Sequence, residues 1–531
     1  MEKELLEKEV LCILDTRQIQ RFMFRSNSYV DTLGGSDLMT HILEDGIRYA
    51  LKSVDPPLER HEYVLSLDPD GALTFFEDSR ILFQLIICAA GNAMFLARTG
   101  LIAQKIFRKV SRYYLDQAYS LNLATAAVEK TNDLGHDIFE LYKKLNNNKT
   151  SAVISNPLGA LPVVLREEHT GEPVIGRDEK NGDYISRASL IRRQEAAYRG
   201  EVIDLTELQS TKGTDGKKYR AVIHIDGNNL GITIGQMLQQ TSDYQKGIRL
   251  RRQVNKSIES QYARIMEDSV TDLKTYFESL DHRESDFAHE FQIIHNSGDD
   301  VNLMCNARLA FPFLDFFFKN LENTFIGEVQ GRRIPLFCCA GVCFATEENS
   351  FHTAFMMAEE CCSSAKKTAK LEKNLRNGLA GNWIDFQICE TPYFQELDLL
   401  RETSFITDAN VNLSLRPYCM DKAARYEEYS YEKLLERVRV LHRLKKKYGW
   451  SFLQRLRENY LLDRIIFREG VSLLQKTGID LEAMLGVPFY RDEDNNIYAS
   501  WYDALKVMPF IPQADSFPES KEERQNENAL H

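Results

Sequence analysis

Residues 291 to 304 constrain this chain most, because they read as an apolar strand, a tight polar turn and a second apolar strand. The turn contains Ser297-Gly298, and glycine readily adopts the positive φ that tight turns require. Asp299 and Asp300 then stand where the second strand begins. Adjacent carboxylates repel each other unless a cation neutralises them, and Mg²⁺ is bound by such carboxylates together with substrate phosphates. We therefore predict an antiparallel hairpin whose turn binds a metal ion.

A second source of carboxylate lies upstream, where a buried-type strand over residues 219 to 226 ends in Asp226. Gly227, Asn228 and Asn229 follow it in a polar loop that opens a helix. Taken singly, Asp226 is more simply interpreted as a helix N-cap and a turn aspartate as a turn residue. Together, in this strand order, they favour the paired-metal site of palm-type nucleotidyltransferases, in which two ions hold the triphosphate.

The order of strands and helices occurs twice along the chain, as β-α-β-β-α-β in each copy. We predict an α+β fold with two ferredoxin-like domains that form a pseudo-dimer within one chain, followed by a helical C-terminal domain. Helical periodicity over 431–448 and 452–475 supports that last domain. The predicted divisions are a first domain at 1–150, a connecting insert at 151–217, a second domain at 218–400, and the helical domain at 401–531, with a disordered tail after Pro512.

The first copy has its own hairpin, over residues 81 to 97, and this stretch is almost entirely apolar. It is short for a membrane span and Gly91-Asn92 interrupts it with a turn, so we predict a buried hairpin and no membrane segment. Because this turn has no carboxylate, we expect no metal in the first copy. Upstream, Gly34, Gly35 and Ser36 are expected to open a helix, where backbone N–H groups can meet an anion.

Composition limits the class of protein more than its activity. The net charge of −12 argues against a protein that coats nucleic acid, although local basic grooves remain compatible with it. The ten cysteines include no CxxC pair, and most lie within apolar patterns, so we expect reduced core thiols and no bound zinc. The charged first residues lack the apolar core of a signal peptide. A cytoplasmic location is the resulting expectation.

Other polar residues have less specific readings. The dipeptide His136-Asp137 lacks the further ligands of a phosphohydrolase and is interpreted as surface polarity. His224 and His295 lie on strands beside the proposed site, and we interpret them as core or supporting residues because Mg²⁺ prefers oxygen. For Lys366-Lys367, a solvated helix face and phosphate binding are equally favoured.

These motifs together resemble the large polymerase/cyclase subunit of type III CRISPR effector complexes, which carries two palm domains. Ser297-Gly298-Asp299-Asp300 stands where that family has Gly-Gly-Asp-Asp. The other matching segments are Ile19-Gln20, Gly34-Gly35-Ser36, Gly91-Asn92, residues 225–231, Ala365-Lys366-Lys367, Leu415-Arg416-Pro417-Tyr418 and Tyr502-Asp503-Ala504-Leu505.

Three departures from that family are visible. The chain begins on the first palm's strand, without the HD nuclease domain. The insert between the palms has no zinc-binding cysteines, although Thr170-Gly171-Glu172-Pro173-Val174 resembles its framework. Ser297 replaces a glycine, which a small side chain tolerates. The first two departures favour a compact, stand-alone signalling synthase.

The resemblance implies an enzyme that makes cyclic oligoadenylate messengers from ATP or other nucleoside triphosphates, in prokaryotic antiviral signalling. Two Mg²⁺ or Mn²⁺ ions would be held by Asp226 and Asp299, with Asp300 assisting. A protein or RNA regulator is left open as a partner. The expected nucleotide-binding residues are Gly227, Asn228, Asn229, Ser297, Gly298, Lys366 and Lys367 in the second palm, and Gly34, Gly35, Ser36 and Asn92 in the first.

Two alternatives remain. A non-catalytic nucleotide sensor or scaffold could keep the same fold, and magnesium-dependent turnover of ATP separates it from an enzyme. A template-directed polymerase is less favoured, because the chain is acidic and shows no obvious template-binding domain.

Overall fold

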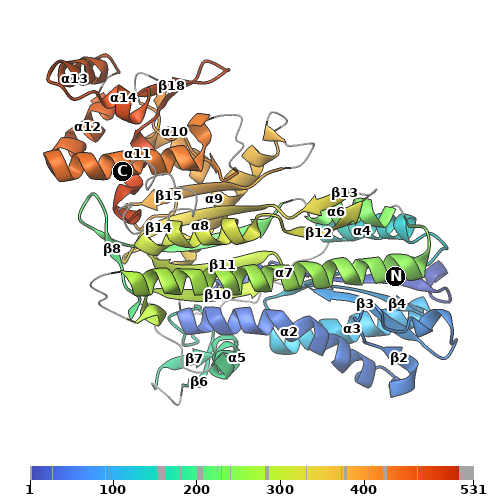
Figure 1. Cartoon of the computed structure of the whole chain (residues 1–531). Helices are drawn as coiled ribbons and strands as arrows, with labels where there is room; N and C mark the ends of the chain where they lie inside the picture. Colours follow the sequence, from blue (N-terminus) through green and yellow to red (C-terminus); the bar gives the residue numbers. More distant parts are fainter. Residues whose placement is uncertain are drawn as a thin grey trace.

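The protein is represented by a computed structural model, which has an α+β architecture built on two large sheets (Figure 1). The α+β class predicted from the sequence is confirmed. The structure describes residues 3–26, 28–89, 91–151, 163–178, 182–199, 207–228, 230–239, 241–280, 286–329, 332–371, 374–375, 380–407, 410–421, 427–462 and 464–512.

The first sheet has the strand order β2-β3-β4-β1-β5, with β1 antiparallel to both β4 and β5. Side chains alternate across β1: Leu11 and Ile13 face a core shared with α4 and the second sheet, whereas Cys12 and Leu14 face α2 and α3. Both faces of this sheet are therefore covered. Its elements are β1 (Val10–Arg17), α1 (Ile19–Met23), α2 (Tyr29–Ser53), β2 (Tyr63–Val64), β3 (Phe83–Ala89), β4 (Asn92–Ala97), α3 (Gly100–Gln117), β5 (Asn122–Glu129) and α4 (Leu134–Ser151).

The second sheet has the order β10-β11-β9-β14-β15-β17, and β8 pairs with the start of β9. Every residue of β14 is buried, because helices cover it and strands flank it. Its elements are β8 (Thr211–Lys212), β9 (Lys218–Gly227), α6 (Leu230–Gln239), α7 (Tyr244–Ser279), β10 (Phe291–Ser297), β11 (Asp300–Asn306), α8 (Ala310–Leu321), β12 (Phe325–Val329), β13 (Arg332–Pro335), β14 (Cys338–Thr346), α9 (Phe351–Ala369), β15 (Trp383–Cys389) and β17 (Tyr418–Cys419).

The two sheets share one arrangement of four strands, since β3-β4-β1-β5 corresponds to β10-β11-β9-β14. Each hairpin also has an irregularity in register at the same distance from its turn, between Leu85 and Ile87 in one and between Ile293 and His295 in the other. The repeated β-α-β-β-α-β order is thus present, and the apolar stretch 81–97 contains the predicted buried hairpin. Among the described residues, no helix is long and apolar enough to cross a membrane.

The two units pack on each other through the long helix α7 and through α2. On α7, the buried guanidinium of Arg252 donates hydrogen bonds to the carbonyls of Leu85 at 2.7 Å and Ile86 at 3.2 Å, both on β3. On α2, the Ser36 hydroxyl lies 2.7 Å from Nδ1 of His295 on β10. Polar contacts therefore fix the first unit against the hairpin that carries the aspartates.

The insert between the units contains a short hairpin of β6 (Val174–Arg177) and β7 (Tyr184–Ser186), followed by α5 (Arg187–Ala196). Helix α5 packs along α2 and lies below one end of that helix in Figure 1. Residues 152–162 before these elements and 200–206 after them lie outside the described residues.

The C-terminal region is mainly helical but also contains a three-stranded sheet, so the predicted helical domain is only partly correct. The helix predicted over 452–475 is divided between two helices, whose inner residues share one core, and the periodicity therefore continues from one to the other. The tail after Pro512 lies outside the described residues. The elements are α10 (Leu397–Ser404), β16 (Val411–Asn412), α11 (Tyr431–Tyr448), α12 (Trp450–Leu462), α13 (Arg464–Lys476), α14 (Leu481–Leu485), β18 (Phe489–Arg491), β19 (Ile497–Ala499) and α15 (Tyr502–Val507).

Two motifs that are far apart in the sequence meet in this region. The buried carboxylate of Asp503 accepts hydrogen bonds from the backbone N–H groups of Leu415 and Arg416 and from the Tyr418 hydroxyl. The Arg416 guanidinium lies 3.3 Å from the same carboxylate. These motifs therefore hold the C-terminal region to the edge of the second sheet.

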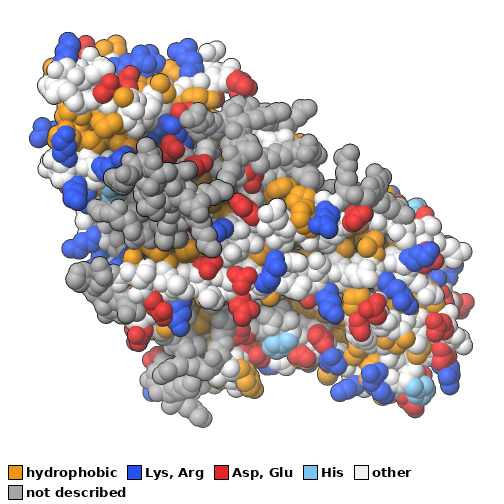
Figure 2. Space-filling view, in the orientation of Figure 1, with side chains coloured by type: hydrophobic (Ala, Val, Ile, Leu, Met, Phe, Trp, Pro, Cys, Tyr) orange, Lys and Arg blue, Asp and Glu red, His pale blue; other side chains and the backbone are white. Residues whose placement is uncertain are grey.

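The outer face of the C-terminal helices carries exposed hydrophobic side chains, and the view in Figure 2 shows hydrophobic atoms at the surface there. Elsewhere on that face, acidic and basic side chains are interspersed. The exposed hydrophobic residues of α12 and α13 are Leu461, Leu462, Ile465, Ile466 and Leu473.

Candidate active site

The structure brings the two predicted carboxylates together. Asp226 lies near the end of β9, and Asp299 lies in the turn between β10 and β11, the strand next to β9. A Cβ atom added to Gly227 would lie only 2.9 Å from Oδ2 of Asp299, so the turn rests directly against the end of β9. Glycine at 227 permits this close approach. Gly298, with φ of 63°, makes the tight turn, as the sequence predicted.

Asp299 lies in an environment that disfavours its charge. Burial, and then the neighbouring Asp226 carboxylate, raise the pKa of Asp299 to about 6 from an ordinary value of 3.8. Asp300 acts in the same direction, and Lys366 opposes it. A cation between the carboxylates would remove this penalty, so the electrostatics fit a metal-binding site.

Lys366 is the cation that the protein itself supplies. Its amino group, on α9, forms an ion pair with the Asp226 carboxylate. Burial acts to lower the pKa of Lys366, but Asp226 outweighs it and the pKa is raised. Lys367 points elsewhere, since it is exposed and pairs with Asp398 on α10 at 3.4 Å. The structure therefore assigns different surroundings to these two lysines, which the sequence treated alike.

Asp300 is held by its own strand. The amide of Asn302 donates a hydrogen bond to Oδ1 of Asp300 at 2.7 Å. The Asn302 oxygen in turn lies 2.7 Å from Nδ1 of His224, which is buried on β9. This places His224 in the supporting role that the sequence favoured. Asn302 was missed, although the predicted second strand already places it on the same face as Asp300.

The start of the loop after β9 is held in place by side-chain hydrogen bonds. The buried amide of Asn228 donates to the carbonyl of Gly381 at 2.8 Å and lies 3.1 Å from Sγ of Cys339. Asn228 thereby ties the end of β9 to the start of β15. Asn229 lies outside the described residues. Ser297 pairs with Asp300 across the turn.

The prediction that Gly34 and Gly35 open a helix is wrong. Helix α2 begins at Tyr29, capped by Ser28, and both glycines lie inside it. A Cβ on Gly34 would lie 1.7 Å from the carbonyl oxygen of Arg192, so Gly34 is required for the contact between α2 and α5. The sequence could not show this, because α5 is distant along the chain. Ser36 is buried and bonded to His295.

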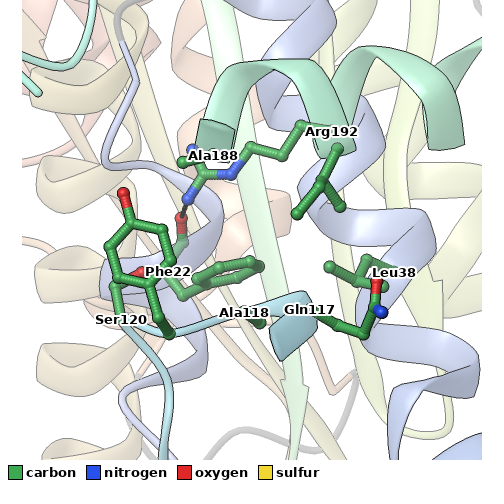
Figure 3. Close-up of a pocket in the computed structure, with 9 residues that line it drawn as sticks. Phe22, Leu38, Gln117, Ala118, Ser120, Ala188 and Arg192 are labelled. Carbon is green, nitrogen blue, oxygen red and sulfur yellow. Dashed lines mark hydrogen bonds between the residues drawn. The ribbon is translucent and has the colours of Figure 1, made fainter. Parts of the chain in front are cut away.

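A narrow hollow lies beside that helix contact, and Figure 3 shows Arg192 reaching over Phe22 there, with Leu38 opposite. Nη2 of Arg192 donates to the Phe22 carbonyl at 2.6 Å, and burial lowers the pKa of Arg192 to about 10. None of the candidate carboxylates lines this hollow.

In the first unit, Asn92 begins β4 and stands opposite Asp15 on β1. The Asp15 carboxylate pairs with Lys149 of α4 at 2.7 Å. The turn glycine, Gly91, has φ of 76°. This end of the first sheet has one carboxylate and one lysine.

The structure also describes the surroundings of the other polar residues considered in the sequence. His136 is exposed, but its neighbour Asp137 is buried and accepts hydrogen bonds from the N–H of Thr131 at 2.7 Å and the Thr131 hydroxyl at 2.8 Å, so the surface interpretation of Asp137 is wrong. The ten cysteines are free thiols, of which Cys88 and Cys389 are partly exposed and the rest buried.

The oxygen ligands at this site suit a hard divalent cation whose coordination shell is completed by a substrate. In the described part of the chain, no group of three or more His, Cys, Asp and Glu side chains has metal-binding geometry. Asp226 and Asp299 supply oxygen ligands from two strands, and Mg²⁺ normally takes its remaining ligands from water and phosphate. The residues present therefore fit Mg²⁺ or Mn²⁺ better than zinc.

Sequence comparisons identify no relative, since no family model and no curated protein matches the chain. Solved structures do match. The Csm1-Csm4 cassette in complex with one ATP has 16% identity and a TM-score of 0.55, with 95% of this chain and 70% of that chain covered. The cassette in complex with AMPPNP has 16% identity and a TM-score of 0.54. The cassette in complex with cA3 has 16% identity and a TM-score of 0.53, and in both cases 95% of this chain and 70% of that chain are covered. At this identity the likeness establishes a shared fold, that of Csm1 of type III CRISPR complexes, as the motifs predicted.

Proposed function

We propose that this protein is a metal-dependent nucleotidyltransferase that joins ATP into cyclic oligoadenylates, acting in antiviral signalling. The observation that carries the proposal is the meeting of Asp226 and Asp299 beside Lys366, at the end of two adjacent strands. The solved structures that share its fold support the same chemistry, since they were determined in complex with ATP, cA3 and cA4.

We further propose that the two units are palm domains arranged as a pseudo-dimer, with the turns at Gly91 and Gly298 facing one cleft. The shared strand order and the matching register irregularities support this arrangement. The second palm would bind the triphosphate that reacts, and the first palm, with Asn92 and Ser36, would form the wall for the acceptor nucleotide.

In the proposed reaction, a ribose hydroxyl of one nucleotide attacks the α-phosphorus of ATP. The bond between the α-phosphorus and the oxygen that bridges it to the β-phosphorus breaks, and pyrophosphate leaves. Bound divalent ions would supply charge for the phosphoryl group and for the attacking oxygen. The protein needs no nucleophile of its own, because positioning and electrostatic stabilisation carry phosphoryl transfer. Repetition lengthens the chain, and attack by its own terminal hydroxyl closes the ring.

The residues of the site divide this work. Asp226 and Asp299 would hold the metal, with Asp300 assisting, and Gly227 and Gly298 let the backbone approach the phosphates. Lys366 would leave Asp226 for the outer phosphates when a cation takes its place at the carboxylate. Asn228 keeps the loop in place through its contact with Gly381. Lys367, exposed beside Asp398, has a minor role.

The test is mass spectrometry of the products formed from each nucleoside triphosphate with Mg²⁺ or Mn²⁺. The proposal expects cyclic oligoadenylates from the wild type and none from Asp226→Asn. Lys367→Ala is the matched control and should retain activity. Binding of ATP without turnover would indicate a nucleotide sensor instead, and products that grow only with a template would indicate a polymerase.

A further inference from the structure

The side-chain amide of Asn302, on β11, is fully buried and makes hydrogen-bonding contacts at both of its ends. Its Nδ2 donates a hydrogen bond to Oδ1 of Asp300 at 2.7 Å, and its Oδ1 lies 2.7 Å from Nδ1 of His224. Burying an amide is costly unless its polar atoms find partners. These two contacts therefore account for an asparagine at this position.

The chemistry of the two partners fixes which way this amide points. An ionised carboxylate only accepts hydrogen bonds, so the nitrogen of Asn302 faces Asp300 and the oxygen faces His224. Nδ1 of His224 must then carry a proton in order to donate to that oxygen. The same Nδ1 lies 3.5 Å from Oδ1 of Asp300. The three side chains thus form one contact, in which the orientation of each depends on the other two.

This contact lies next to the candidate metal ligands on one face of the sheet. Asn302 stands opposite His224 in the pairing of β11 with β9. Asp300 lies two residues before Asn302 on β11. Asp226 lies two residues after His224 on β9. Because residues two apart share a strand face, Asn302 and His224 form the layer beside the two carboxylates.

The surroundings of this layer leave it little freedom to move. The Phe355 ring of α9 lies edge-on to His224, with centroids 5.8 Å apart. On the other side, His295 of β10 stands opposite Asn302, and its Nδ1 lies 2.7 Å from the Ser36 hydroxyl of α2. All five side chains are buried. A closely packed layer therefore supports the carboxylates from within the sheet.

We propose that Asn302 is a positioning residue, which holds the Asp300 carboxylate in the orientation that metal binding requires. A hydrogen bond to Oδ1 restricts rotation of the carboxylate and so sets the direction of Oδ2, and such support commonly raises the affinity of a metal site. This inference rests on the proposed function for its kinetic consequences, but its effect on metal binding does not require turnover.

The test variant is Asn302→Leu, which keeps a similar volume and removes both contacts. Asn306→Leu is the matched control, because Asn306 is a buried asparagine of the same strand whose amide also donates to a carboxylate, that of Glu290, at 2.8 Å. Mn²⁺ titration followed by electron paramagnetic resonance should show binding about 3-fold or more weaker in Asn302→Leu than in the wild type. Asn306→Leu should bind Mn²⁺ as the wild type does.

The kinetic consequence should fall on turnover. With ATP and saturating Mn²⁺, Asn302→Leu should lower kcat about 10-fold and change KM for ATP less than about 2-fold. The reason is that the loss concerns the orientation of a metal ligand rather than nucleotide binding. Asn306→Leu should keep the wild-type kcat.

A double variant separates positioning from simple stabilisation. Asn302→Leu leaves Nδ1 of His224 buried without its acceptor and should lower Tm by about 3 °C or more. Adding His224→Phe removes that polar group, so Tm should recover by about half or more. Mn²⁺ binding should stay as weak as in Asn302→Leu, because Asp300 still lacks its donor.

Opposite results overturn the inference. Wild-type Mn²⁺ affinity in Asn302→Leu would remove its basis, as would an equal loss of affinity in Asn306→Leu or recovery of Mn²⁺ binding together with Tm in the double variant. If the wild type binds Mn²⁺ but makes no product, the proposed function fails, and the Mn²⁺ titration alone then decides whether Asn302 positions the site.

Discussion

The corresponding ends of the two sheets differ in two carboxylates, because Asp299 and Asp300 in the second sheet stand where Gly91 and Asn92 stand in the first. In the first sheet Asp15 faces Asn92 across β1 and β4, and in the second the pairing of β9 with β11 ends at Ile225 and Val301, one residue short of Asp226 and Asp300. Asp15 forms an ion pair with Lys149 on α4, the helix that follows β5. Asp226 forms one with Lys366 on α9, the helix that follows β14. Both lysines stand fifteen residues after the first residue of their helix.

The turns account for the different numbers of carboxylates at the two ends. The position of Asp299 in the second turn corresponds to Gly91 in the first. One lysine balances the single carboxylate of Asp15, whose side chain is 12% exposed. In the second unit the lysine pairs with Asp226, and burial, followed by the Asp226 carboxylate, raises the pKa of Asp299. The two added carboxylates turn an isolated ion pair into an acidic cluster, which is the arrangement that favours a bound cation.

The largest expected effect is a difference in catalytic activity between variants at the two ends. Asp299→Asn should lower the rate of product formation about 10³-fold or more, because a ligand for the ions that stabilise the phosphoryl charge is lost. Asp15→Asn should lower it less than about 3-fold, because the proposed mechanism assigns no metal ligand to the first unit. Rates from ATP and Mn²⁺ measure both. Comparable losses in the two variants would mean that the first unit shares the chemistry.

A stability effect of up to about 3 kcal/mol is expected from the pKa of Asp299, which burial and Asp226 raise to about 6 from 3.8. The folded state binds this proton more tightly than the unfolded state, so the metal-free protein should lose stability as the pH rises from about 4 to about 6. Asp299→Asn should lack that loss. Urea unfolding in a chelator measures it, and parallel pH profiles for the two proteins would contradict the charge imbalance.

Substitutions of the two lysines should have different effects, one on nucleotide binding and the other on the stability of the fold. Lys366→Ala should raise KM for ATP about 10-fold, because it removes a cation near the phosphates. Lys149→Ala should leave KM unchanged and destabilise the fold by about 1–3 kcal/mol, because it leaves Asp15 buried without its partner. Steady-state kinetics and thermal unfolding distinguish the two. An unchanged KM in Lys366→Ala would mean that this lysine serves Asp226 alone.

The smallest effect is expected at the turn itself. Ser297→Gly should change activity less than about 2-fold, because Ser297 pairs with Asp300 through the backbone and glycine preserves that pairing. A loss of 10-fold or more would give the Ser297 side chain a role that the pairing does not explain.

Much of the fold could be predicted from the sequence, because its signals are local. The alternation of apolar residues defined β9, β10 and β11, and the glycine turns fixed both hairpins. The position of Asp299 in its turn followed from the same pattern. The division of the predicted helix over 452–475 was not visible, since two helices that share a core keep one periodicity.

The sequence by itself therefore determined which residues end strands, which form turns, and that one copy has the two extra carboxylates. Only the tertiary structure decided that Gly34 packs on α5, that Asp137 is buried, and that Ser36 meets His295 in the other unit. It also decided that Lys366 rather than Lys367 meets Asp226. The physical reason is that strand and turn preferences act over a few residues, whereas these contacts join segments that are brought together only when the two units pack.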